Sequence, residues 1–137
     1  MKHPPAFLLA IPVCAALLSG CGSGGAYAPK NATKYNQETT AKFVLLDGGT
    51  QRSVTCPGLQ EKRLEDGRLE VLASLRNREN RRIEVQVNCV FKDEQHFAVD
   101  ETPFQVVILN ENATEGIRFV SMNDKAKNYT VRVRQSR

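Results

Sequence analysis

The longest strand of the chain is predicted at residues 82–92, which read RIEVQVNCVFK. Apolar residues occupy every second position from Ile83 to Phe91, and the positions between them are mostly polar. Successive side chains of a strand point to opposite faces of a sheet, so one face of this strand is buried. We expect the strand to be central to its sheet, with Cys89 on the buried face.

A β-hairpin is predicted on the N-terminal side of this strand. Its arms are Leu59–Glu65 and Arg68–Leu75, and an Asp-Gly pair between alternating arms is a strong hairpin signal. The second arm has an inner face of Leu69, Val71, Ala73 and Leu75 and an outer face of Glu70, Leu72, Ser74 and Arg76. Earlier in the chain, two further strands are predicted at Ala41–Leu46 and Thr50–Cys56, ended by turns at residues 47–49 and 57–58.

Three more strands are predicted after the longest one, at Phe104–Leu109, Thr114–Val120 and Tyr129–Arg134, beyond a long polar loop at residues 93–103. Short strands separated by turn signals, without an amphipathic helix, indicate an all-β protein. We therefore predict a single antiparallel β-sandwich of immunoglobulin-like arrangement over residues 41–137. A strand-rich barrel is the alternative, because patterning fixes faces better than topology.

Residues 1–20 have the features of an exported signal segment. The apolar run Ala6–Leu18 spans about 13 residues, whereas a membrane-spanning helix needs about 20. Lys2 precedes the run and small residues follow it, as in signal peptides. The run ends in LLSGC at Leu17–Cys21, which resembles the lipobox of bacterial lipoproteins. The resemblance implies that Cys21 carries lipid and begins the mature protein; an ordinary secretory signal is the alternative.

Residues 21–40 are rich in Gly, Ser, Ala, Asn and Thr and lack a periodic apolar pattern. This composition is typical of a flexible tether, with a typical reach of about 25 Å. The membrane is therefore an expected partner, through the lipid on Cys21, and no other cofactor is expected.

The net charge narrows the kinds of partner that the protein is expected to bind. The net charge of +4 falls to +3 in the mature chain, because Lys2 leaves with the signal. The basic residues are spread along the domain, so nucleic-acid binding is not expected.

Cys56 and Cys89 are left as one pair of cysteines in a compartment that permits disulfides. We predict a bond between them; two separate buried thiols are the alternative.

The region from Leu75 to Arg134 resembles the YcfL-type predicted periplasmic lipoproteins, a family without an established activity. The matching words are Leu75-Arg76-Asn77, Val90-Phe91-Lys92-Asp93, Thr102-Pro103-Phe104, Val107-Ile108, Asn123-Asp124 and Tyr129-Thr130-Val131-Arg132. The chain departs from the family where Gln95 replaces an expected Gly. The resemblance implies an immunoglobulin-like envelope domain and transfers no catalytic residue.

Residues suited to catalysis or metal binding are few. Once the signal is removed, His96 is the one remaining histidine, and a metal site needs three or four converging ligands. We therefore predict no metal site and no enzymatic activity. A wall-modifying hydrolase is the alternative, using Asp93, His96, Asp100 and Glu101 of the loop at residues 93–103.

Basic side chains are the remaining candidates for binding. Arg118, Arg132 and Arg134 would share an outward face if the last two strands pair. Positive side chains on edge strands also prevent sheet-to-sheet aggregation. The functional hypothesis is that these three arginines dock onto an acidic envelope protein or a cell-wall polymer.

Together these features predict a lipid-anchored bacterial envelope protein that acts as a non-enzymatic binding or scaffolding module. Gly22 follows Cys21 in place of the Asp that retains enterobacterial lipoproteins at the inner membrane, so we expect the outer membrane, facing the periplasm. An accessory subunit of a secretion or cell-wall synthesis machine is the alternative function.

Overall fold

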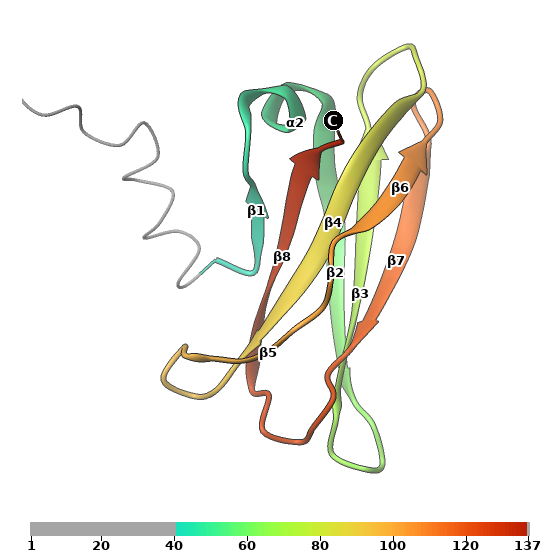
Figure 1. The fold of residues 1–137 in the computed structure, drawn as a ribbon. Coiled ribbons are helices and arrows are strands. Elements are labelled where there is room, and N and C mark those ends of the chain that lie inside the picture. The colour runs from blue at the N-terminus through green and yellow to red at the C-terminus, as the bar shows by residue number, and fades with distance from the viewer. Residues whose placement is uncertain (1–40, 137) are drawn as a thin grey trace, which may run out of the picture. The chain divides into compact units, whose positions relative to one another are not determined.

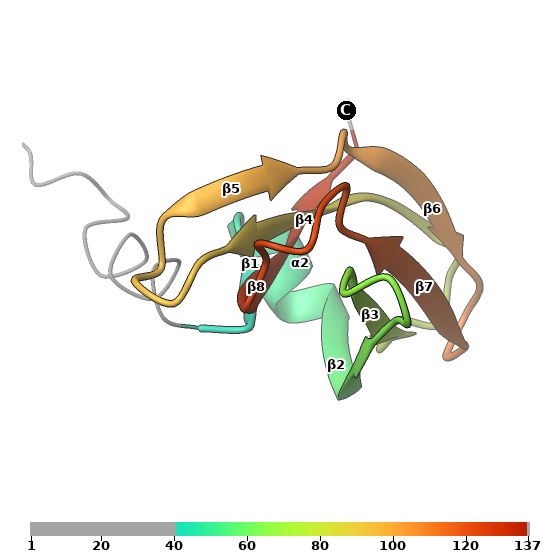
Figure 2. The same cartoon turned by 90° about the horizontal axis from the view of Figure 1, so that it is seen from below.

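Two β-sheets pack face to face as a β-sandwich in the computed structural model, which describes residues 41–136 (Figures 1 and 2). The predicted signal segment, Cys21, the tether and Arg137 lie outside the described residues. The five-stranded sheet contains β1 (Phe43–Leu45), β4 (Ile83–Lys92), β5 (Ala98–Glu101), β6 (Gln105–Leu109) and β8 (Asn128–Gln135). The three-stranded sheet contains β2 (Val54–Arg63), β3 (Leu69–Asn77) and β7 (Thr114–Val120). The predicted sandwich is therefore confirmed.

Strand β4 is central to the five-stranded sheet, as its alternation predicts. It pairs with β8 on one side, while β6 and β5 pair with its first and second halves on the other. Cys89 is buried on the inward face, as predicted. Asn88 is buried as well, although it points outward, and its amide donates to the side chain of Glu101, the last residue of β5, and to the carbonyl of Thr102, which follows β5.

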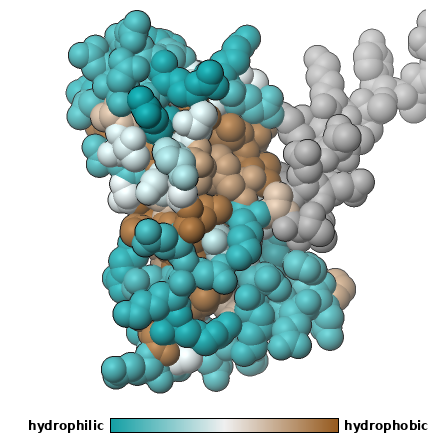
Figure 3. All heavy atoms as spheres, turned by 180° about the vertical axis from the view of Figure 1, so that it is seen from behind, coloured by the Kyte–Doolittle hydropathy of each residue, from teal (hydrophilic) through white to brown (hydrophobic). Residues whose placement is uncertain are grey.

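The core is formed by the inward faces of both sheets. On β3 the predicted inner residues Leu69, Val71, Ala73 and Leu75 are all buried. They meet Val85, Val87, Phe91, Val131 and Val133 of the opposite sheet in one hydrophobic cluster. Seen from behind, hydrophilic side chains cover both ends of the sandwich and a band of hydrophobic surface lies between them (Figure 3).

The strand predicted at Thr50–Cys56 is partly wrong, because residues 48–53 form a short helix, α2 (Gly48–Ser53). Asp47 caps the helix by accepting a hydrogen bond from the Thr50 N–H at 2.8 Å, and this satisfies one of the free donors of the first turn. The Asp-Gly-Gly sequence predicts a turn, and here the turn continues into a helix.

Strand β2 is longer than predicted, because Pro57-Gly58 does not end it. The register between β2 and β3 shifts between Thr55 and Gly58, which marks an irregularity where the proline sits. Proline is tolerated there because β2 lies at the edge of its sheet and needs no donor on its free side.

Two other features differ from the prediction. The loop at residues 93–103 contains the short strand β5, which forms a tight hairpin with β4. In addition, β1 pairs with β8 in parallel, from Phe43–Val131 to Leu45–Val133, whereas the other strand pairs of the described residues are antiparallel. The immunoglobulin-like arrangement stays a prediction.

The sandwich has two ends, which we call the Ala41 end and the α2 end. At the Ala41 end the chain enters beside the start of β8, where the Thr130 hydroxyl donates to the Ala41 carbonyl at 2.7 Å. The loops at residues 64–68, 93–97 and 121–127 lie at the same end (Figure 1). Helix α2 and the last residues of β8 lie at the opposite end. Within residues 41–136, no helix has the length and apolar character needed to cross a membrane.

Candidate functional site

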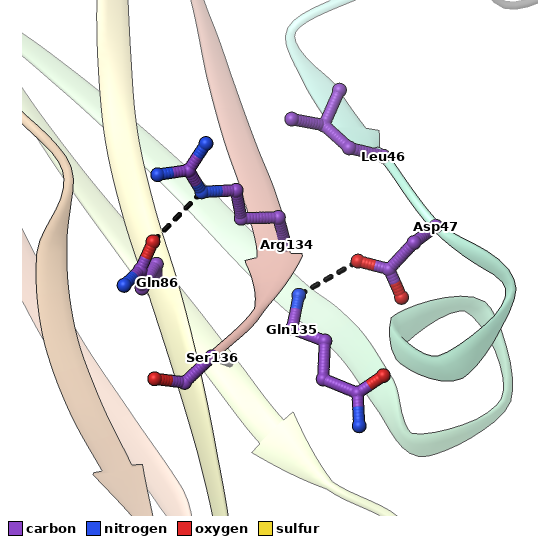
Figure 4. A pocket seen from close by; sticks show the side chains of 6 residues that line it. All are labelled: Leu46, Asp47, Gln86, Arg134, Gln135 and Ser136. Atoms are coloured by element: carbon purple, nitrogen blue, oxygen red, sulfur yellow. Dashed lines mark hydrogen bonds between the residues drawn. The ribbon is translucent and has the colours of Figure 1, made fainter.

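A pocket of about 590 Å³ opens at the α2 end, and we call it the α2-end pocket (Figure 4). It is lined by Leu46, Asp47, Gln86, Arg134, Gln135 and Ser136. A second hollow of about 470 Å³ shares Gln135 and Ser136 with it and extends over α2 and the loop before β4. Three arginines, Arg52, Arg81 and Arg82, line this second hollow. Glu79 and Glu84 line it as well, and Glu79 pairs with Arg81, so the α2 end is concave and carries charges of both signs.

Asp47 fixes one wall of the α2-end pocket. Its carboxylate accepts hydrogen bonds from the N–H of Thr50 at 2.8 Å and from the N–H of Gln135 at 2.7 Å. Burial raises the pKa of Asp47, but these backbone hydrogen bonds outweigh burial, and the pKa is lowered overall. One side chain thus joins the start of α2 to the end of β8 and keeps its negative charge at neutral pH.

Arg134 forms the opposite wall. Its Nε donates to the side-chain oxygen of Gln86 at 2.7 Å. Its guanidinium carbon lies 3.8 Å from the centroid of the Phe104 ring, which is a close cation–π contact. Within residues 41–136, the two terminal NH2 groups of Arg134 have no hydrogen-bonding partner. The guanidinium is therefore held in place by the hydrogen bond of its Nε and by the stacking of one face on Phe104. Its terminal donors are free for a ligand.

Arg132 occupies a different environment, although it lies two residues away on the same face of β8. It pairs with Glu101, and its Nε donates to the side-chain oxygen of Asn88 at 3.0 Å. Its guanidinium carbon is 5.6 Å from the Phe104 ring, and its side chain is only 21% exposed. Arg132 therefore supports the ring and the connection from β5 to β6, and its donors are largely used within the protein.

The predicted grouping of Arg118 with Arg132 and Arg134 is wrong. Strand β7, which carries Arg118, pairs with β3 and not with β8. Arg118 therefore lies on the outer face of the three-stranded sheet, where its Nε donates to Glu70 at 2.7 Å. Alternation places Arg118 correctly on an outward face, but it does not identify the sheet to which a strand belongs.

The predicted disulfide between Cys56 and Cys89 is not formed in the structure, where both residues are free thiols. Cys56 lies at the irregularity of β2, and its thiol donates to the Gly58 carbonyl at 3.3 Å. Cys89 is fully buried in β4 of the other sheet. Burial raises the pKa of the Cys56 thiol and raises that of Cys89 to about 12. Both thiols are therefore weakly reactive at neutral pH.

The acidic residues of the alternative hydrolase are engaged in separate hydrogen bonds and ion pairs. The Asp93 carboxylate accepts from the N–H groups of Gln95 and Phe97 and so closes its own hairpin. Asp100 accepts from the Met122 N–H at 2.7 Å, and Glu101 pairs with Arg132. His96 is exposed at a positive φ of 66°. No group of three histidine, cysteine or acidic residues in positions 41–136 is arranged to hold a metal ion.

Sequence reasoning identifies Arg134 but misses the residues that make it a site. Phe104 belongs to an apolar run that resembles a buried strand, and Gln86 occupies an unremarkable outward position of β4. Only the register of β4 against β8, in which Gln86 faces Arg134, brings these side chains together. Asp47 carries a local signal, because Asp is a preferred helix N-cap, but the two following glycines favour a turn.

No protein-family model matches the sequence, and no curated protein matches it. The fold is similar to that of Campylobacter jejuni cj0090, with a TM-score of 0.59 and 13% identity over 69% of this chain and 98% of that chain. It is also similar to a DUF1425 family member from Shewanella sp. pv-4, with a TM-score of 0.54 and 15% identity over 61% of this chain and 77% of that chain. At these identities the similarity shows a shared β-sandwich fold and carries no information about ligands.

Proposed function

We propose that this protein is a lipid-anchored lipoprotein of the bacterial envelope, and that its sandwich is a non-enzymatic binding module. In this proposal the Arg134 wall of the α2-end pocket, rather than the wall formed by the charged Asp47, receives an acidic group, either a carboxylate of a partner protein or an anionic group of a cell-wall polymer. The lipobox-like LLSGC ending at Cys21 supports the anchor. The fold shared with a DUF1425 family member and the YcfL-type words support membership of an immunoglobulin-like envelope lipoprotein family.

The observation that carries the binding role is the fixed guanidinium of Arg134. A planar guanidinium presents a fork of donors that matches carboxylate and phosphate geometry, and fixing it before binding reduces the entropy lost on binding. Phe104 and Gln86 hold the Arg134 fork while leaving both terminal NH2 groups open to the pocket. The acidic groups of the alternative hydrolase, in contrast, are engaged in loop and strand contacts.

The positions of the two ends favour this role. A lipid anchor at Cys21 would hold the domain through its Ala41 end, so the α2-end pocket would point away from the membrane that holds the lipid. Anchoring confines the pocket to a thin layer and raises its effective concentration near a partner, so even modest affinity suffices. Gly22 in place of Asp favours the outer membrane, facing the periplasm.

The test is photo-crosslinking in intact membranes, with a benzophenone amino acid at Gln135, which lines both hollows. We expect one principal neighbour to be captured, and its capture to be lost in Arg134→Ala but retained in Arg118→Ala. The same crosslinker at Leu72, on the outer face of the three-stranded sheet, is the matched control and should not capture this neighbour. Capture that is unaffected by Arg134→Ala would contradict the proposed site.

The anchor is tested separately with Cys21→Ser. This variant should leave the membrane fraction and lose labelling by a radioactive fatty acid, while its β-sheet circular dichroism stays unchanged. If Cys21→Ser remained in the membrane with labelling intact, the lipid anchor would be wrong.

Identification of the crosslinked neighbour also separates a free-standing binder from the alternative function. A subunit of a secretion or wall-synthesis machine would capture a component of that machine.

A further inference from the structure

The Ala41 end carries the two most exposed large hydrophobic side chains of the described residues. Met122 is 82% exposed in the loop between β7 and β8, and Phe97 is 70% exposed at the hairpin between β4 and β5. Leaving a large apolar side chain in water forgoes the stabilisation that burial would give. Two such side chains at one end of a small domain are candidates for contact with something apolar.

Both side chains project from loops with fixed backbones. Phe97 follows the hairpin turn at residues 93–96 and donates its N–H to the Asp93 carboxylate at 2.9 Å. Met122 donates its N–H to the carboxylate of Asp100, a residue of β5, at 2.7 Å, so the second loop is attached to the strand that follows Phe97. One hydrogen bond thus closes the turn before Phe97, and another attaches the Met122 loop to β5.

The chain that leads to Cys21 leaves from this same end. The Lys42 carbonyl accepts from the Val131 N–H at 2.9 Å, and the Ala41 carbonyl accepts from the Thr130 hydroxyl. From the composition of residues 22–40 we predict a tether with a typical reach of about 25 Å. A lipid on Cys21 would therefore keep the Ala41 end, rather than the α2 end, near the bilayer.

We propose that Phe97 and Met122 insert into the interface of the membrane that holds the lipid anchor, and so orient the domain with its α2-end pocket facing outward. This inference rests on the proposed lipid anchor at Cys21. Exposed charges of both signs border the two residues, including Glu94, Asp124 and Lys125, so the occupant is selected by apolar contact rather than by net charge. The apolar face of an interfacial helix penetrates about 5–10 Å, to the boundary between headgroups and acyl chains, and we expect these side chains to reach a similar depth.

The chain contains no tryptophan, so a single introduced tryptophan reports its own surroundings. Three variants of the full lipidated protein are compared in phosphatidylcholine vesicles, with and without lipids brominated at the upper acyl chain. They are Phe97→Trp, Met122→Trp and the control Val106→Trp. Val106 is also exposed and apolar, at 56%, but it lies on β6 opposite Gln86, toward the α2 end.

We expect the first two variants to show blue-shifted emission that brominated lipid quenches, and the Val106→Trp control to show neither effect. The control also accounts for the tendency of any exposed tryptophan to enter a membrane. Equal emission and equal quenching in all three variants, with the protein still bound to the vesicles, would overturn the inference and leave the anchor intact. Protein that does not sediment with the vesicles at all would overturn the anchor and this inference together.

Discussion

The guanidinium carbon of Arg134 lies 3.8 Å from the centre of the Phe104 ring, so the last strand of the chain stacks on the residue that precedes β6. Strands β6 and β8 do not pair with each other, because β4 lies between them. The contact therefore spans the outer face of the five-stranded sheet and fixes the proposed ligand-binding side chain from a neighbouring segment.

This contact predicts an energetic coupling between the two residues. Arg134→Ala, Phe104→Leu and the double variant should give a coupling of about 0.5–1 kcal/mol in the free energy of unfolding, measured with urea. Phe104→Leu keeps the apolar bulk and removes the aromatic face. As a control, Arg118→Ala should combine additively with Phe104→Leu, since Arg118 belongs to the other sheet. Additivity in the Arg134 cycle would show that stacking does not hold the guanidinium.

Asn77 is predicted to be the most sensitive polar residue of the α2 end. It is fully buried, and its Nδ2 lies within 3.2 Å of the carbonyl oxygens of Arg81, Leu109 and Asn110. Asn77→Ala would leave these carbonyls without their donor and should cost about 1–3 kcal/mol in chemical unfolding. Asn77→Asp should cost more, because a carboxylate would then face the carbonyl oxygens. The exposed Asn80→Ala serves as control and should change stability by less than about 0.5 kcal/mol.

Asp47 should make stability depend on pH in the acid range. Its pKa is lowered in the folded protein from an ordinary value of 3.8. A lowered folded pKa means that the contribution is present above the unfolded pKa and is lost as pH falls through the folded pKa. Asp47→Asn keeps an N-cap but not the charge, so its difference from the wild type should shrink below about pH 4. Asp47→Ala should lose about 1 kcal/mol at neutral pH, as measured by urea unfolding at each pH.

The two thiols should react differently with an alkylating reagent. Cys89 is fully buried and its pKa is raised to about 12, while Cys56 is only partly buried. In the folded protein we expect Cys56 to be alkylated first and Cys89 only after unfolding, with both reactions faster at higher pH. Mass spectrometry without reductant distinguishes this from the disulfide predicted from sequence. If unfolded protein took up no reagent at these two positions, the bond would be present.

Gly67 should resist substitution because of its backbone. Its φ is +84°, and an added Cβ would lie 3.0 Å from the Cβ of Asp124. Gly67→Ala should cost about 1–2 kcal/mol in thermal or urea unfolding, from the left-handed conformation. The control is Gly58→Ala, where an added Cβ meets no atom within 4 Å. Equal effects of the two substitutions would show that the hairpin at residues 64–68 adjusts without strain.

Alternation predicts the strands of this protein well where one sheet face is buried. Strands β3, β4 and β7 follow the predicted ranges closely, because one face of each is buried and a shift by one residue would expose it. The pattern fails for β5, where burial is partial, and for α2, which is too short for a periodic signal. Local patterning likewise contains no information on which sheet a strand joins.

The candidate site is less predictable than the fold for the same reason. Arg134 is identifiable from its outward position, but the ring and the amide that fix it come from β4 and from the segment before β6. Their proximity follows from register, which emerges only when the strands pair. The predicted lipidation of Cys21 depends on a local word in the sequence and lies outside the described residues.

Strand β1 runs parallel to β8 from the Ala41 end, and this direction has a mechanical consequence. A force applied at residue 41 and resisted at the α2 end would act along the strand axes. It would load the three β1–β8 residue pairs in shear, all at once, instead of peeling them apart one after another. Asp47, attached to Gln135 just beyond β1, would share that load. The shortest strand of the sheet, β1, is thus placed to resist tension through its pairing with β8 before that tension reaches the core.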